Sequence, residues 1–285
     1  QELEFRRLID NFNKTFAVKP PENEASEPKA STPKPAANPT PEAGAGQFSL
    51  FGGEDPSAAV ATQNYGRETA TSVPHFYQSV SGDLGLKLFI KQLMSQTSVC
   101  FDTETTGLNP LTAELVGIAF SWEAHKGFYI PFPESFEEAQ QLIELFRPFF
   151  EATHIEKIGQ NLKYDLKVLH KYNMEVKGPL FDTMIAHYLI NADMRHNMEV
   201  LAETYLNYTP ISITDLIGKK GKNQLSMRDV PLEKLTEYAV EDADITYQLA
   251  SHFKKELTDA DTLRLFNDIE IPLVKVLAAM ELEGI

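Results

Sequence analysis

Two carboxylates, Asp102 and Glu104, directly follow a short apolar run in the stretch SVCFDTETTGLNP, residues 98–110. Such a run predicts a buried strand. Because strand side chains alternate between two faces, both acids would project from the same face. Two negative charges held side by side repel each other. The pair must therefore be either solvated at the surface or neutralised by a positive partner.

Two further motifs carry acids at positions suited to a shared site. Asp165 lies in GQNLKYDLKVL, one turn into a helix that leaves a strand. Tyr238 and Asp242 lie four residues apart in YAVEDADIT, so they share one face of a helix. Each acid also has an ordinary explanation, since an aspartate in a first helical turn interacts favourably with the helix dipole. A chain with 41 acidic residues will also contain accidental clusters.

Considered together, the four carboxylates could converge from one strand and two helices on a pair of divalent cations. Two metal ions about 3.5–4 Å apart hold the attacking and leaving oxygens of an in-line phosphoryl displacement. Oxygen-only ligands favour Mg²⁺ or Mn²⁺. The cations would offset the repulsion among the acids and would let an acidic protein approach a phosphate backbone.

The elements that must position these residues follow from hydrophobic periodicity and capping signals. Apolar runs predict strands at 99–103, 115–121, 128–131 and 155–159. Helical spacing predicts helices at 84–94, 135–150, 162–172, 182–189, 198–205, 231–257 and 263–282, with Ser135 as an N-cap. Strands followed mostly by helices, around one central mixed sheet, indicate an α/β or α+β domain.

The composition narrows the class of protein. The formal net charge of −15 argues against a protein that holds nucleic acid by bulk electrostatic attraction. Cys100 is the only cysteine, so the chain forms no internal disulfide and no cysteine zinc cluster, and a reducing cytoplasm is the expected compartment. No apolar run reaches the ~18 residues of a membrane span, and no secretory signal opens the sequence.

Four segments are expected along the chain. Residues 1–18 show helical spacing but cannot build a core, so we interpret them as the terminal helix of a preceding domain. Residues 19–72 have the composition of a flexible, disordered linker. Residues 73–260 should form the folded domain, and 261–285 the first helix of a following domain. Because the sequence begins without Met and stops within a helical pattern, we interpret it as part of a longer protein.

The three acidic motifs together resemble those of the DEDD exonuclease superfamily. Over residues 73–257 the sequence is most similar to the 3′–5′ proofreading exonuclease domain of bacterial DNA polymerase I (family A). The order and separation of the motifs match, as does the tyrosine-type third motif, Tyr-x-x-x-Asp. FDTMIAHYLIN, LAETYLNY and GKNQLS fit the same domain. The resemblance implies a ribonuclease H-like exonuclease fold, with helices flanking a central mixed sheet.

The two ends of the chain fit the same family. LEFRRLIDNF resembles the tail of its 5′-nuclease domain, and IEIPLVKVLAAMELEGI resembles the start of its polymerase domain. The resemblance therefore implies a parent protein that is also a DNA-directed DNA polymerase.

The resemblance also implies a role for each motif residue. Asp102 would bridge two divalent cations, Mg²⁺ or Mn²⁺. Glu104 and Asp242 would complete the tighter metal site, and Asp165 would hold the second metal. Tyr238 would orient the water that attacks the terminal phosphodiester, with a metal lowering the pKa of that water. The product would be a nucleoside 5′-monophosphate.

Contacts to the DNA 3′ end are expected just beyond the acids. Backbone groups at Thr103 and Thr105 lie where a terminal nucleotide would sit, and Leu108 would wedge against its base, a sequence-tolerant contact. Loop packing is the alternative for Leu108. Gln160 and Asn161 would donate to the sugar or phosphate, and an N-cap role is the competing explanation for Asn161.

For the remaining charged groups we take a structural or solvated role as the default interpretation. The basic loop GKKGK, residues 218–222, is by default solvated, with a phosphate contact as the alternative. Asp182, Glu241 and Asp244 are interpreted as supporting or surface acids.

A second kind of signal lies in the expected linker, where QFSLF is its only concentrated apolar stretch. The residues Gln47, Phe48, Ser49, Leu50 and Phe51 resemble the short motif by which bacterial replication and repair proteins bind the sliding clamp. The second position departs from that motif, where Leu is more usual. A flexible linker could present the motif to a groove on the clamp. The alternative is that the stretch packs on this protein's own surface.

The leading hypothesis is a metal-dependent 3′–5′ exodeoxyribonuclease acting on the single-stranded 3′ end of DNA in proofreading. It is expected to be a monomer, without membrane contact, in the bacterial cytoplasm at the nucleoid. Two alternatives remain at this point: a ribonuclease D-like exoribonuclease, and a non-catalytic spacer that tethers the clamp.

Overall fold

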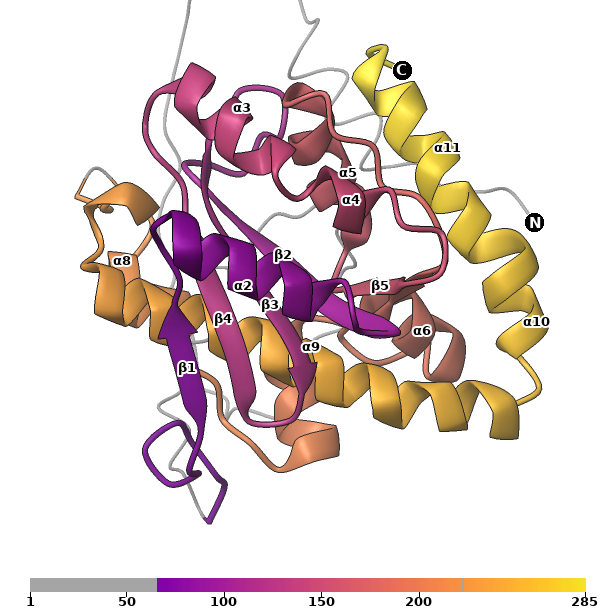
Figure 1. Ribbon diagram of the computed structural model, residues 1–285. Coiled ribbons are helices and arrows are strands. Elements are labelled where there is room, and N and C mark those ends of the chain that lie inside the picture. The colour runs from indigo at the N-terminus through magenta and orange to yellow at the C-terminus, as the bar shows by residue number, and fades with distance from the viewer. Residues whose placement is uncertain (1–65, 222) are drawn as a thin grey trace, which may run out of the picture. The chain divides into compact units, whose positions relative to one another are not determined.

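The computed structural model describes residues 66–221 and 223–285, which fold around a six-stranded mixed sheet (Figure 1). They fall within the compact unit Ala61–Ile285. The helix expected over 1–18, most of the expected linker and the QFSLF motif at 47–51 lie outside the described residues.

The strand order in the sheet is β1-β4-β3-β2-β5-β6. The pairs β2–β3 and β3–β4 are antiparallel, whereas β1–β4, β2–β5 and β5–β6 are parallel, which confirms the expected mixed sheet. The strands are β1 (Phe76–Ser79), β2 (Ser98–Thr105), β3 (Leu115–Glu123), β4 (Lys126–Pro131), β5 (Glu156–Gly159) and β6 (Leu180–Asp182). The expected strands correspond to β2–β5. β1 and β6 were not predicted: β6 has only three residues, and β1 has no apolar run and alternates between exposed and half-buried side chains.

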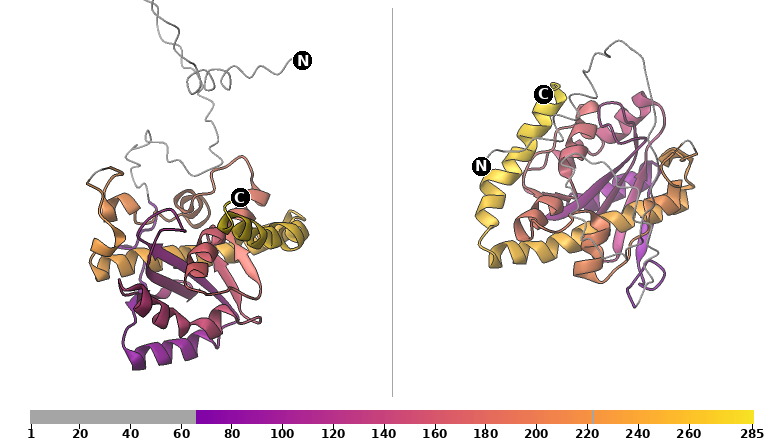
Figure 2. Two further views of the ribbon diagram at one scale, coloured as in Figure 1. Left: turned by 90° about the horizontal axis from the view of Figure 1, so that it is seen from above. Right: turned by 180° about the vertical axis from the view of Figure 1, so that it is seen from behind.

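Helices cover both faces of the sheet, and α2 and α9 lie on opposite sides of it (Figure 2). The helices are α2 (Asp83–Leu93), α3 (Phe136–Glu144), α4 (Arg147–Phe150), α5 (Leu162–Lys171), α6 (Thr183–Ile190), α7 (Met198–Leu201), α8 (Ile213–Ile217), α9 (Leu232–Asp259), α10 (Leu263–Leu265) and α11 (Ile271–Leu282). None of the helices in the described part of the chain combines the length and apolar character that crossing a membrane requires.

Two of the expected helices contain a π-helical turn, Ala202–Leu206 after α7 and Phe266–Glu270 between α10 and α11, and a third is broken. The helix predicted over 135–150 begins as expected, because the Ser135 hydroxyl accepts a hydrogen bond from the Glu138 amide at 3.4 Å. It ends at Glu144, and α4 starts at Arg147 with Pro148 in its first turn. Proline has no amide hydrogen and clashes with the preceding turn, so it is tolerated at a helix start but not in the interior.

Both ends of the described part of the chain pack on the domain. Within the expected linker, Glu68 is hydrogen-bonded to the main chain of Asn207 and Thr209, so residues 66–72 are attached to the domain. At the other border, α11 packs along α5 in the same compact unit. Glu281 of α11 forms ion pairs with Lys163 and Lys167 of α5.

The strand β2 divides its side chains between the two layers. Phe101 packs in the core under α2, whereas Cys100 packs in the core under α9. Asp102 pairs in register with Ala119, which also belongs to the α9 core. The alternation therefore directs Asp102, and with it Glu104, toward α9.

Candidate active site

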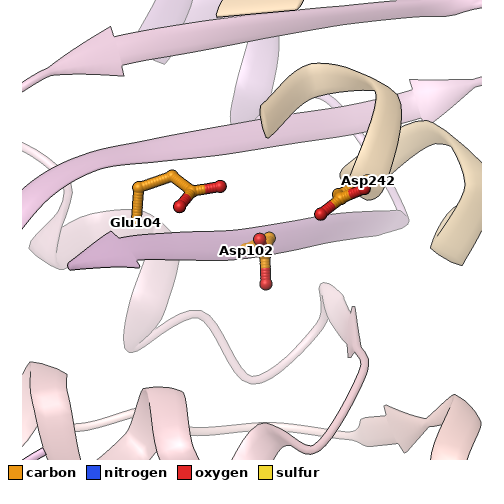
Figure 3. Close-up of side chains that lie close together, drawn as sticks. All are labelled: Asp102, Glu104 and Asp242. Carbon is orange, nitrogen blue, oxygen red and sulfur yellow. The ribbon is translucent and has the colours of Figure 1, made fainter. Parts of the chain in front are cut away.

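Three carboxylates from β2 and α9 meet between the sheet and the helix (Figure 3). One oxygen from each of Asp102, Glu104 and Asp242 lies within 4.8 Å of the other two. Glu104 and Asp242 are only 6 % and 7 % exposed, so the charges are not simply solvated. Such a group of oxygen ligands is suited to a hard divalent cation.

Small side chains on α9 allow this close approach. Ala239 and Ala243 are fully buried, four residues apart on the helix. Asp242 lies beside them and is therefore carried toward β2 as the helix packs on the sheet. The period of the strand and the period of the helix thus bring the first and third motifs together.

The fourth acid, Asp165 on α5, lies near the group but does not join it. It is 2 % exposed, and one of its oxygens accepts hydrogen bonds from the Thr103 hydroxyl at 2.6 Å and the Thr103 amide at 3.2 Å. The charge of Asp102 is close enough to raise the pKa of Asp165. Asp165 is thus adjacent to the other three carboxylates but oriented by Thr103.

Tyr238 lies one helical turn before Asp242 and is buried beside it. A hydrogen bond from its hydroxyl lowers the pKa of Asp242, opposing the larger effect of burial. Burial raises the pKa of Tyr238, and the charges of Asp242, Glu104 and Asp102 raise it further, which agrees with a hydroxyl beside the acid cluster.

Burial is the main cause that raises the pKa of all four carboxyl groups. It raises the pKa of Asp102 to about 7. Asp102 and Asp165 raise the pKa of Glu104 further by charge repulsion. This arrangement costs free energy in the ionised state, and a bound cation would remove that cost.

The residues expected to contact the DNA 3′ end differ in whether their side chains are exposed or already hydrogen-bonded within the protein. Leu108 is 77 % exposed, so its side chain is available. The Thr105 hydroxyl contacts Tyr164 at 2.5 Å and the Gly107 carbonyl at 2.9 Å. Both the amide and the hydroxyl of Thr103 donate to Asp165. The side-chain nitrogen of Gln160 donates to the His196 carbonyl at 2.7 Å, and its side-chain oxygen accepts from the Thr183 hydroxyl.

Asn161 occupies the N-cap position of α5, as the competing explanation expects, but it does not cap the helix with its side chain. Its side chain makes no capping bond, and its backbone is left-handed with φ of 60°. Asp182 accepts from the amide of Leu162 at 2.7 Å and also from Met184 and Ile185, so one buried carboxylate serves the starts of both α5 and α6. Asp182 is 1 % exposed and is therefore not a surface acid.

The other charged groups separate into buried and exposed sets. Glu241 and Asp244 are 0 % and 1 % exposed, which excludes the surface interpretation for both. Lys219 and Lys220 are exposed on their loop, as the solvated interpretation expects. Lys222 lies outside the described residues.

Two tyrosines near the acids were not singled out from the sequence. Tyr164 donates to the Gly107 carbonyl at 2.7 Å and so fixes the loop after β2. Tyr129 of β4 lies with its ring over Gly117 of β3. The available signal was Gly117 itself, since a glycine inside an apolar strand indicates the close approach of another group.

Comparisons with known proteins agree with the geometry. A protein-family model described as 3′–5′ exonuclease, of the DNA polymerase A type, matches residues 77–258. DNA polymerase I of Borreliella burgdorferi is 36 % identical over 212 residues, covering 73 % of this chain and 23 % of the relative. DNA polymerase I of Pseudomonas aeruginosa is 32 % identical over 237 residues, covering 80 % and 26 %.

Solved structures share the fold at lower identity. Brucella melitensis NrnC with bound Mg²⁺ superposes with a TM-score of 0.56 at 21 % identity, covering 74 % of this chain and 94 % of that one. Escherichia coli RNase D, an exoribonuclease involved in structured RNA processing, superposes with a TM-score of 0.57 at 19 % identity, covering 71 % and 50 %. These likenesses confirm the ribonuclease H-like exonuclease fold.

The chain spans about a quarter of the length of the curated relatives it matches. The part that matches is the part that holds the acid cluster. The family match extends over most of the chain and includes all three acidic motifs. The chain therefore belongs to the family of 3′–5′ exonuclease domains found in bacterial DNA polymerase I.

Proposed function

We propose that this domain hydrolyses the terminal phosphodiester at the 3′ end of a single DNA strand, releasing a nucleoside 5′-monophosphate. The observation that carries the proposal is the convergence of Asp102, Glu104 and Asp242 within 4.8 Å. Burial raises the pKa of each of these acids, so the cluster favours a positive partner. The same domain in a whole polymerase would remove mispaired 3′ ends.

The donor set fits two divalent cations, with Mg²⁺ as the first candidate because every donor is a carboxylate oxygen. Asp102, Glu104 and Asp242 would hold one ion, and Asp102 with Asp165 a second. Bound ions would supply the positive charge that stabilises the attacking and leaving oxygens in an in-line displacement.

The protein's own residues would position the reactants. Tyr238 would orient the attacking water, with Asp242 holding the tyrosine hydroxyl in place. The water oxygen would bond to the phosphorus of the terminal phosphodiester, and the bond between that phosphorus and the 3′ oxygen of the penultimate nucleotide would break. The leaving oxygen would take up a proton from solvent and become the new 3′ hydroxyl, while the attacking water would lose a proton to solvent. The exposed Leu108 would contact the terminal base, and Thr105, Gln160 and Asn161 would shape the surrounding loop surface. Thr103 would act by orienting Asp165.

The test is a time course on a 5′-labelled single DNA strand with Mg²⁺. We expect a ladder that shortens from the 3′ end, and its loss in Asp102→Ala. Asp259→Ala is the matched control, because Asp259 is an exposed acid on α9, the helix that carries Asp242. Equal, slow degradation by wild type and Asp102→Ala would show that the acids do not catalyse this reaction. An RNA strand of the same sequence separates deoxyribonuclease from ribonuclease D-like activity.

We further propose that QFSLF, residues 47–51, tethers the protein to a bacterial sliding clamp at the nucleoid. The support is the motif itself, because these residues lie outside the described part of the chain. A peptide covering 46–53 should bind the clamp, and Phe51→Ala should abolish binding. Equal binding by both peptides would remove the reason for this proposal.

A further inference from the structure

Tyr129 is a buried tyrosine whose hydroxyl has no hydrogen-bond partner in the described structure. The residue is 0 % exposed, so water does not reach the hydroxyl. A buried donor that makes no hydrogen bond carries the full cost of its desolvation. Such groups are rare in folded proteins and call for an explanation beyond packing.

The sequence makes room for this hydroxyl beside Glu104. Tyr129 pairs in register with Ala119, which pairs with Asp102, so all three side chains project toward α9. The tyrosine ring does not stand upright but lies over Gly117, the residue that pairs with Glu104. A Cβ at Gly117 would lie 2.0 Å from the tyrosine oxygen.

The position over Gly117 brings the tyrosine hydroxyl next to an acceptor. Side chains of residues paired across antiparallel strands share a face, with Cβ atoms about 4.5–5.5 Å apart. The hydroxyl occupies the place of the Gly117 Cβ and is therefore a cross-strand neighbour of Glu104. Burial and the charge of Glu104 raise the pKa of Tyr129, so its hydroxyl keeps its proton. The hydroxyl can therefore stabilise the Glu104 carboxylate by donating a hydrogen bond to it.

We propose that Tyr129 is a positioning residue that donates a hydrogen bond to Glu104 when Glu104 binds a divalent cation. The inference rests on the proposed function, because it assigns Glu104 to the metal. A glutamate has several rotatable bonds, and a fixed donor behind it selects one orientation of its carboxylate. Tyr238 has the same relation to Asp242 on the helix side, so a tyrosine would stand behind an acid on each side of the cluster.

The test compares Tyr129→Phe with wild type in the 285-residue chain, by titration calorimetry with Mn²⁺ and by thermal unfolding with and without the metal. We expect Mn²⁺ to bind about tenfold or more weakly in Tyr129→Phe, the size of effect seen when a ligand loses its outer hydrogen bond. The metal-free unfolding temperature should not fall, because the hydroxyl has no partner to lose. Mn²⁺ affinity within about twofold of wild type, or a fall in metal-free stability at unchanged affinity, overturns the inference.

A matched control is Tyr172→Phe. The Tyr172 hydroxyl accepts a hydrogen bond from the Leu115 amide at 2.9 Å, in the core on the other face of the sheet. This variant should lower the unfolding temperature and leave Mn²⁺ affinity unchanged. Gly117→Ala should displace the Tyr129 ring and weaken Mn²⁺ binding to the same extent, with no further loss in the double variant. Additive losses would contradict the inference. If Gly117→Ala does not fold, the Tyr129→Phe comparison decides alone.

The same experiment separates this inference from the proposed function. If wild type and Asp102→Ala bind Mn²⁺ equally poorly, the metal centre itself is wrong. If wild type binds and Tyr129→Phe binds equally well, only the role of Tyr129 is wrong.

Discussion

Two aspartates that lie two residues apart on α9, Asp242 and Asp244, are both buried but differ in what surrounds them. Asp244 accepts hydrogen bonds from the Tyr77 hydroxyl at 2.7 Å, the His125 amide at 2.9 Å and the Gln248 amide at 3.0 Å. Asp242, two residues earlier, faces Asp102 and Glu104 instead, and among residues 66–221 and 223–285 the hydroxyl of Tyr238 is its one side-chain donor.

The difference shows two ways in which a fold accommodates a buried carboxylate. Asp244 is held by three protein donors, so it connects β1, the β3–β4 turn and α9, and about three of its four acceptor sites are occupied. Asp242 lies among other acids, which raise its pKa and favour a cation. Burial alone therefore does not distinguish the acids that we propose bind metal; the shortage of donors does.

The largest effect that would test this comparison is expected for Asp242→Asn. Nuclease activity should fall by about 10³-fold or more, as when a main charge-stabilising group is removed from an active site. The metal-free protein should become more stable, because a repulsive buried charge is lost. Activity on the 5′-labelled strand and thermal unfolding measure the two effects. If Asp242→Asn is active, Asp242 has a structural role, as Asp244 does.

The reciprocal result is expected for Asp244→Asn. The amide has one acceptor oxygen where the carboxylate has two, so at least one buried donor loses its partner. The free energy of unfolding should fall by about 1–3 kcal/mol, measured by denaturant titration. Activity per folded molecule should stay near wild type. Loss of activity at full stability would mean that the roles of the two aspartates are not separate.

The effect of Mg²⁺ on stability should depend on pH in one direction. The pKa of Asp102 lies at about 7 in the folded protein, above its ordinary value of 3.8. The folded state therefore holds a proton that the unfolded state releases, and the metal-free protein loses stability as pH rises between these two values. A bound cation replaces the proton and removes the loss.

The unfolding temperature with Mg²⁺ minus that without it should therefore be small near about pH 5 and large near about pH 8. Taking the difference cancels groups away from the cluster. One such group is His187, whose pKa burial lowers to about 4 and which costs stability as pH falls from its ordinary value. Asp242→Asn should reduce the difference, and Asp244→Asn should not. An Mg²⁺ effect independent of pH would contradict ionised acids as the binding groups.

Local periodicity was enough to predict the part of the site that depends on nearby residues. The two-residue spacing of Asp102 and Glu104 and the four-residue spacing of Tyr238 and Asp242 set which side chains share a face, and the structure keeps both pairs together. Most of the helices, and the strands β2–β5 of the sheet, follow from the same periods.

Local periodicity could not predict hydrogen-bond partners that are distant in the sequence. Asp244 and its donor Tyr77 are separated by 167 positions, and nothing local indicates that they meet. Asp182 caps α5 from 20 positions away, so Asn161, the residue at the expected cap position, makes no cap. Whether an acid has donors is decided by tertiary packing, and this is the property that separates Asp242 from Asp244.

The smallest effect is expected for Leu108→Ala, because Leu108 lies in the exposed loop after β2 and the acids of the cluster are enclosed. Leu108 is 77 % exposed, so its removal should change the free energy of unfolding by less than about 0.5 kcal/mol. If it contacts the terminal base, KM for a single strand should rise by about three- to tenfold, with kcat little changed. Leu111→Ala is the matched control, a 52 % exposed leucine of the same loop. Equal KM values for the two variants would indicate that Leu108 serves only in loop packing. A fall in kcat would indicate that Leu108 lies closer to the reacting phosphate than its exposure suggests.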